Sequence, residues 1–348
     1  MPSGQFKTSY RDDTKIFQTV WVKLWLALLL AFLLVFPIFA GKYLLYLAKL
    51  VGIAVIGVLG LNILSGFTGQ ISLGHSAFLA LGAYASTLLT LRLGIPFWLS
   101  MPLAGLFSAL CGLLLALPCL RLRGLYLAIA TFAFYFIVEY AIVHWNSLTN
   151  GTGGLTVADP SVLGFAIDSD TKVYFLILIL VVPALIFARN LFRTETGRAF
   201  IAVRDNDIAA EIIGINVVRY KILAFMICSF YAGVAGSLYA ITLSFIGPEH
   251  FTFLMTIEYL AMGLVGGIGT IAGSVFGAVF MIALPEAIRL LRDALSSHYP
   301  FLVSRMSDLQ SGLYGLVIIL FLIFEPTGLF GLWLRVKKYW LAWPYSYR

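Results

Sequence analysis

The feature that most constrains this chain is a series of apolar runs, each about as long as a helix that crosses a bilayer. Crossing the hydrocarbon core takes about 20 apolar residues in a helix. Gly, Pro and charged residues separate the runs, which predict about ten spans, at 20–40, 43–64, 75–92, 97–118, 124–145, 173–192, 221–245, 254–266, 271–291 and 309–331. The predicted fold class is therefore an all-α polytopic membrane protein.

The eighth span is the shortest of these runs, and it precedes the glycine-rich stretch GLVGGIGTIAG at 263–273. Such glycines are compatible with a broken helix and equally with one long bent span. Within this stretch and just after it, Gly263 and Gly267, and likewise Gly269, Gly273 and Gly277, are four residues apart. That spacing favours close helix packing in lipid, and a gating hinge is the alternative.

Composition leaves no room for a large soluble domain. Of the 348 residues, 61% are hydrophobic and 11% are charged, whereas soluble domains have about 45–50% apolar and about 25% charged residues. We therefore expect a single transmembrane domain over 1–348. Residues 24–36 follow a charged head and could pass for a secretory signal, but the apolar run continues to Ala40 and further spans follow, so an uncleaved first span is expected.

The basic residues predict the orientation, because cytoplasmic loops are enriched in Lys and Arg. Ten spans with both termini in the cytoplasm place 16 of the 23 basic residues there: Lys7, Arg11, Lys15, Lys23, Arg121, Arg123, Arg189, Arg193, Arg198, Arg204, Arg219, Lys221, Arg335, Lys337, Lys338 and Arg348. The predicted cytoplasmic parts are then the tails 1–19 and 332–348 and the loop 193–220. The long loop 146–172 lies outside. The formal charge of +7 is explained by this bias, and no nucleic-acid partner is expected.

No motif for catalysis or cofactor binding is apparent. Cys111, Cys119 and Cys228 lie in apolar runs without the spacing of a zinc site. The phosphate-binding pattern G-x-x-x-x-G-K-[ST] is absent from the sequence. We expect no metal, no cofactor and no enzymatic activity in this chain.

The loop between the sixth and seventh spans contains the segment GRAFIAVRDNDIAAEIIGIN, 197–216, which is unusually polar for this chain. Asp205 or Asn206 can cap a helix, and Gly214 can end it in a left-handed conformation. Ile208 and Ile212 share one face of that helix because they are four residues apart. So short a helix is unstable alone in water. It therefore rests on the protein's own cytoplasmic face or lipid headgroups, or it docks on a partner.

Three stretches resemble one known family. They are LNILSGFTGQISLGHSAFLALGAYAS (61–86), the segment 197–216 continued by VVRYKILAFMICSFYAGVAGSLYA (217–240), and TIEYLAMGLVGGIGTIAGSVFGA (256–278). Together they resemble the LivM family, the permease subunits of ABC importers for branched-chain amino acids, from about residue 50 to 331. The resemblance implies a type II-like importer permease. It also implies that the loop 193–220 couples to an ATPase through Arg204, Asp205, Asp207, Ile208, Ala209, Ala210, Glu211, Ile212 and Gly214.

The same resemblance implies the partners. They are a paralogous permease subunit, two cytoplasmic ATPase subunits that bind the ATP, and an extracytoplasmic binding protein that delivers the amino acid across a bacterial inner membrane. Permeases for urea or short amides have similar motifs and remain an alternative. A stand-alone secondary transporter is a further alternative, but it predicts a cluster of ionisable residues at mid-membrane that the sequence lacks.

Polar groups inside apolar spans are candidates for the translocation path, because a charge at mid-bilayer costs roughly 2.5–3.5 kcal/mol. Glu258 could instead stabilise a broken helix, and the segment 66–85 could be only a glycine-rich helix start. The candidates for the path are Gly69, Gln70, Ser72, His75, Glu139 and Glu258. Asn62, His144 and Glu286 are further polar residues in or near spans.

Two other segments have simpler interpretations. The loop TNGTGGLTVADPSVLG (149–164) has turn-forming residues throughout. It either faces the binding protein, as the family resemblance implies, or is a plain connection. The stretch RVKKYW (335–340) is predicted to anchor the chain at the headgroups.

Overall fold

The computed structural model describes residues 20–120, 122, 124–157, 160–162, 165–167, 169–296, 312, 315–316, 318–321, 323–325 and 327–342. In these residues the chain is almost entirely helical, and seven helices are long and apolar enough to cross a membrane. The predicted all-α polytopic fold is confirmed. The predicted tail 1–19 lies outside the described residues, as do Arg121, Arg123 and the last six residues of the predicted tail 332–348.

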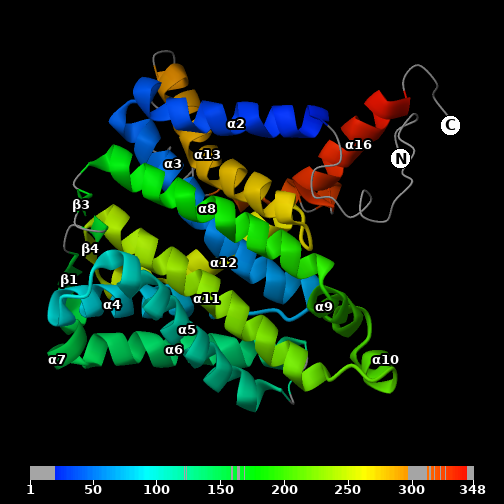
Figure 1. The fold of residues 1–348 in the computed structure, drawn as a ribbon, viewed down its shortest axis with the longest axis horizontal. Coiled ribbons are helices and arrows are strands. Elements are labelled where there is room, and N and C mark those ends of the chain that lie inside the picture. Colours follow the sequence, from blue (N-terminus) through cyan, green and yellow to red (C-terminus); the bar gives the residue numbers. More distant parts are fainter. Residues whose placement is uncertain are drawn as a thin grey trace.

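The helices agree with the predicted spans to within a few residues over most of the chain. They are α2 (Val20–Phe39), α3 (Lys42–Leu61), α4 (His75–Leu93), α5 (Phe97–Cys119), α6 (Leu125–His144), α7 (Asn146–Thr149), α8 (Asp170–Arg193), α9 (Glu195–Asp205), α10 (Asp207–Ile212), α11 (Val217–Leu243), α12 (Phe253–Gly266), α13 (Ile271–Ser296) and α16 (Gly328–Ala342). Figure 1 shows α9, α10 and α16 at one end of the bundle, and α7 with β1, β3 and β4 at the opposite end.

The loop 193–220, predicted to be cytoplasmic, lies at the first of these ends, and the loop 146–172, predicted to be external, lies at the second. At the end that carries α7, the predicted external loop forms short strands. β1 (Leu155–Thr156) pairs antiparallel with β4 (Phe245–Ile246), and β2 (Ser161–Val162) pairs with β3 (Phe165–Ala166). The first pair joins the predicted external loop to the connection between α11 and α12, so this loop is anchored to the bundle.

Several helices are interrupted. α3 continues into a π-helix, Asn62–Phe67, and residues 68–74 are not helical before α4 begins at His75. α12 ends at Gly266, and residues 267–270 form a break before α13. Of the two possibilities left open at 263–273, the broken helix is therefore the one observed.

The predicted span 309–331 is wrong at its C-terminal end. The described residues between 312 and 324 are helical, but Glu325 is not, and a separate helix, α16, begins at Gly328. The sequence has Pro at position 326, and a residue that precedes proline is disfavoured in helical conformation. α16 contains the stretch 335–340 that is predicted to be an interfacial anchor.

Close helix packing depends on glycine. α11 packs against α3, α4 and α5, and a methyl group on Gly82 of α4 would collide with the backbone of Gly233 in α11. Of the four-residue glycine series, Gly273 and Gly277 do pack closely, against the backbone of α12 and of the residues just after it. Among the described residues of this chain, nothing lies within 4 Å of a methyl group placed on Gly263, so close packing there stays a prediction.

The remaining two glycines of that series, Gly267 and Gly269, lie in the break between α12 and α13. Both have positive φ, +119° and +77°, a conformation that other residues rarely adopt. These two glycines therefore permit the chain to turn rather than two helices to approach.

A buried lysine of α3 forms an ion pair with the exposed first residue of α8. Lys49 of α3 is only 2% exposed, and its Nζ lies 2.6 Å from Oδ1 of Asp170 at the start of α8. An unpaired buried ammonium group would be strongly destabilising. The aspartate therefore allows a lysine to occupy an apolar helix, and it links two helices far apart in sequence.

Candidate functional site

The short helices α9 and α10 project from the predicted cytoplasmic end of the bundle (Figure 1). α9 packs back onto the protein, because Phe200 and Val203 are buried and Phe200 meets the ring of Tyr220 edge-on, with centroids 6.1 Å apart. α10 is different. Its Ala210 is buried, but Ile208, Ile212 and the following Ile213 are 57%, 81% and 73% exposed.

The ends of α10 form as the sequence predicts. Oδ1 of Asn206 accepts hydrogen bonds from the backbone N–H groups of Ile208 and Ala209, both 3.0 Å long, which is the role of an N-cap. Gly214 follows the helix with φ +90°. Of the two predicted caps, Asn206 is therefore the one used. Its neighbour Asp205 instead accepts from Arg204.

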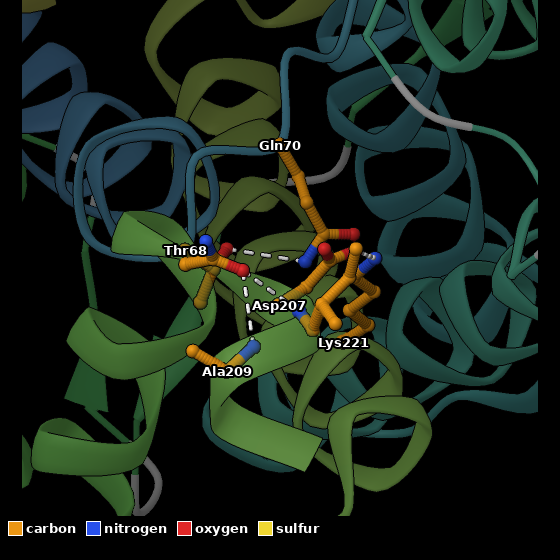
Figure 2. Close-up of polar contacts among 7 residues, drawn as sticks. Thr68, Gln70, Asp207, Ala209 and Lys221 are labelled. Carbon is orange, nitrogen blue, oxygen red and sulfur yellow. Dashed lines mark hydrogen bonds and ion pairs between the residues drawn. The ribbon is translucent and has the colours of Figure 1, made fainter. Parts of the chain in front are cut away.

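An ion pair attaches α10 to the next membrane helix. Nζ of Lys221 in α11 lies 3.3 Å from Oδ2 of Asp207 in the first turn of α10. Figure 2 shows the Asp207 and Lys221 side chains meeting above Ala209, with Thr68 and Gln70 drawn in the same view. The Asn206 cap and the Asp207–Lys221 ion pair hold the start of α10 in place. The isoleucine face of the helix therefore has a defined orientation relative to α11. Asp207 contributes to this attachment, and Glu211 remains exposed.

Arg204 belongs to the last turn of α9, and its side chain contacts the protein interior as well as the neighbouring Asp205. Its Nη1 donates to the carbonyl of Gly66, 3.3 Å away, and its Nη2 lies 3.0 Å from Oδ1 of Asp205. A methyl group on Gly69, whose φ is +68°, would contact Arg204. The predicted coupling residue Arg204 and the predicted path residue Gly69 are therefore neighbours.

The other predicted path residues from 70 to 75 are buried in protein. Gln70, Ser72 and His75 have little or no exposed surface, and the Gln70 side chain donates to the Thr68 hydroxyl over 3.2 Å. The ring of His75 packs against that of Tyr259, with centroids 5.2 Å apart. Non-helical backbone at membrane depth is tolerated when protein buries it, and most of segment 68–74 satisfies that condition.

Glu258 and Glu139 line two different cavities. The cavity at Glu258 has a volume of about 230 Å³, whereas the cavity at Glu139 has about 10 Å³, roughly room for one water molecule. The larger cavity is lined by Leu50, Ile53, Ala54, Tyr239, His250, Thr252, Leu254, Met255, Glu258, Tyr259, Met262 and Ile282. Neither is lined by Gly69, Gln70, Ser72 or His75.

The larger cavity is lined mainly by aliphatic and aromatic residues, with His250 and Thr252 as further polar members and Glu258 as its one acid. Within the described part of the chain, the Glu258 carboxylate has no hydrogen bond or ion pair. Among those same residues no group of three or more His, Cys, Asp or Glu is placed to hold a metal ion. The cavity therefore suits a small molecule that carries one cationic group and an apolar body.

Three residues that contribute to the loop 193–220 or to the contacts beside it were not among the predicted site residues. Ile213 extends the exposed face of α10, and Lys221 pairs with Asp207. Asn62 connects the π-helix to the break before α13. Only Asn62 gave a signal in the sequence, as an amide within an apolar run.

Known proteins with similar sequences are membrane permeases. Residues 43–322 match the family model described as the permease component of branched-chain amino acid transport systems. The chain is 33% identical to the high-affinity branched-chain amino acid transport system permease protein LivM of Escherichia coli, and equally to that of Salmonella typhimurium. Each alignment covers 89% of this chain and 75% of the relative.

A more distant relative is the probable branched-chain amino acid transport permease protein LivH of Methanocaldococcus jannaschii. It is 27% identical over 80% of this chain and 89% of its own length. No solved structure matches. Since the family model covers most of the chain and LivM proteins align along nearly all of it, this multi-pass membrane protein belongs to the LivM family of branched-chain amino acid ABC transporter permeases.

Proposed function

We propose that this chain is one of two membrane subunits of an importer driven by ATP hydrolysis in separate subunits, and that α10 docks into a cleft of an ATPase. The observation that carries the proposal is the exposed isoleucine face of α10 on a helix that is capped by Asn206. Burying one such side chain contributes about 1.5–3 kcal/mol. A face of two or three isoleucines therefore contributes roughly 3–9 kcal/mol toward holding α10 in a protein groove.

The connections of this element suggest how docking produces transport. α8 leads directly into α9, and Lys221 of α11 is bonded to Asp207 of α10. When ATP binding closes the two ATPase subunits, α10 moves with them, and α8 and α11 tilt. A paralogous permease completes the path, and an extracytoplasmic binding protein delivers the amino acid.

In the same proposal the cavity at Glu258 receives the amino acid during passage. Its carboxylate faces the ammonium group, and its aliphatic walls contact a branched side chain. One unpaired charge gives weak binding, which a path that must release its substrate requires. Gly69, Gln70, Ser72, His75 and Glu139 remain predicted members of the path in other states of the transporter.

The experiment is uptake by proteoliposomes that contain this chain with the paralogous permease, the ATPases and the binding protein. We expect leucine uptake that requires internal ATP and is unaffected by collapsing ion gradients. Glu211→Lys on α10, or a bulky residue at Gly214, should abolish it while the protein still inserts. Glu195→Lys, the same change at an exposed acid of α9, is the matched control.

Three outcomes would contradict the proposal. Uptake that follows an ion gradient without nucleotide would indicate a stand-alone transporter. Uptake of urea or a short amide in place of leucine would change the substrate. Normal uptake by the Glu211→Lys protein would remove α10 as the docking element.

A further inference from the structure

The two helix interruptions at the predicted cytoplasmic end of the bundle are in direct contact. The π-helix Asn62–Phe67 ends α3, and the break at 267–270 joins α12 to α13. A methyl group on Gly66 would collide with the backbone at Gly269, so the two backbones approach as closely as glycine permits. π-helices frequently occur at functional sites.

Both polar atoms of the Asn62 side-chain amide form hydrogen bonds that connect the two interruptions. Its Nδ2 donates to the carbonyl of Thr270 over 2.7 Å and to the hydroxyl of Ser274 over 2.8 Å. Its Oδ1 accepts from the N–H of Gly269 over 2.7 Å. Asn62 is 3% exposed, and hydrogen bonds are stronger in such a low-dielectric interior than in water. The break before α13 is therefore fixed to the end of α3.

The π-helix and the break at 267–270, joined by Asn62, form a junction, and Arg204 of α9 is its third member. Its guanidinium donates to the carbonyl of Gly66, four residues after Asn62 and directly beside the Asn62–Gly269 bond. Gly69 permits the close approach, because a side chain there would contact Arg204. Arg204, in the last turn of α9, is thus connected to the start of α13 through its own side chain, the π-helix and the side chain of Asn62.

α12 relates this junction to the cavity. It is a helix of 14 residues, and it contributes Leu254, Met255, Glu258 and Met262 to the cavity wall. Its C-terminal end is the break that Asn62 holds. A displacement of the break therefore moves α12 as a short rigid rod and changes the shape of the cavity.

We infer that Asn62 and Arg204 are positioning residues that transmit movement of α9 and α10 to α12, and so relate the state of the ATPase to the shape of the Glu258 cavity. The inference rests on the proposed function. It differs from the docking proposal because neither residue has to contact the ATPase. Arg204, which the family pattern groups with the docking residues, acts inward in this assignment.

The test measures the number of ATP molecules hydrolysed for each leucine transported by the reconstituted complex. Arg204→Gln removes the charged donor to Gly66 at a half-exposed position, so the protein should fold. We expect it to bind the ATPases normally and to hydrolyse ATP, but to use at least tenfold more ATP per leucine. Arg204→Lys, which keeps a cationic donor, should restore part of the coupling. Arg198→Gln on the same helix is the matched control.

Asn62→Ser tests the second link and is first checked for normal co-purification of all subunits. Because the two residues act in series, the double variant should be no less coupled than the worse single variant. An unchanged ATP-to-leucine ratio in Arg204→Gln would overturn the inference. So would a loss of ATPase binding by Arg204→Gln as large as that of a docking-face variant, because Arg204 would then be a docking residue. Failure of the proposed function is distinct, since the unmodified complex would then show no ATP-dependent uptake.

Discussion

Removing apolar carbons from Ile212 should weaken ATPase binding by a predictable amount. Ile212 is 81% exposed, so nearly all of its side chain is available to be buried on docking. Ile212→Ala removes three carbons, worth about 0.8 kcal/mol each on burial, which gives about 2 kcal/mol after allowing for the part already covered. That corresponds to a roughly 30-fold increase in the dissociation constant. Ile212→Val removes one carbon and should give roughly a threefold increase.

The assay is titration of purified ATPase onto the permease pair in lipid nanodiscs. The substitution should not disturb α10 itself, since alanine favours helix slightly more than isoleucine does. Ile137→Ala on α6, where the isoleucine is 65% exposed in a membrane helix, is the control and should leave the dissociation constant unchanged. The reasoning is refuted if both Ile212 variants bind the ATPase as tightly as the unmodified protein.

Three further changes test other parts of the structure. At the cavity, Ala54→Cys should react faster with a cationic thiol reagent than with an anionic one, and adding Glu258→Gln should remove that preference; equal rates with Glu258 intact would count against an ionised carboxylate there. In the bundle, Gly82→Ala should lower the free energy of unfolding in detergent by about 1–3 kcal/mol through overpacking, whereas Gly263→Ala, where no described residue of this chain lies within 4 Å of the added methyl group, should not. At α10, Asn206→Ala should cost about 1 kcal/mol of local stability and so speed hydrogen exchange of the α10 amides about fivefold; unchanged exchange would show that the cap is dispensable.

The apolar runs were sufficient to predict most of the helices, because span length is imposed by the bilayer and not by details of packing. The span that contains α3 was predicted to end at residue 64, and the helix is observed to continue as a π-helix to Phe67. α4 was predicted to begin at residue 75, and it does. The short helix α10 was also predictable, since Asn206 and Gly214 are local signals. The helix α9 was not, because its stability depends on burying Phe200 and Val203 against other helices.

Long-range contacts limited prediction of the site. Nothing local to Asn62 indicates that its amide bonds with residues about 210 positions later, and nothing local to Arg204 indicates a bond to Gly66. The exposed isoleucines were predictable as one face of a helix, but not as exposed to solvent. Glu139 and Glu258 line two different cavities. The sequence could not predict this, because both residues are simply glutamates within apolar runs.

The Lys49–Asp170 pair has a consequence for how the protein is made. The two residues are 121 positions apart, and ribosomes add about 5–20 residues per second. Lys49 therefore waits about 6 to 24 s after its own synthesis before its counter-ion exists. During that interval α3 lacks the carboxylate that pairs with Lys49 in the finished structure, so the ion pair between α3 and α8 forms only after the start of α8 has been made.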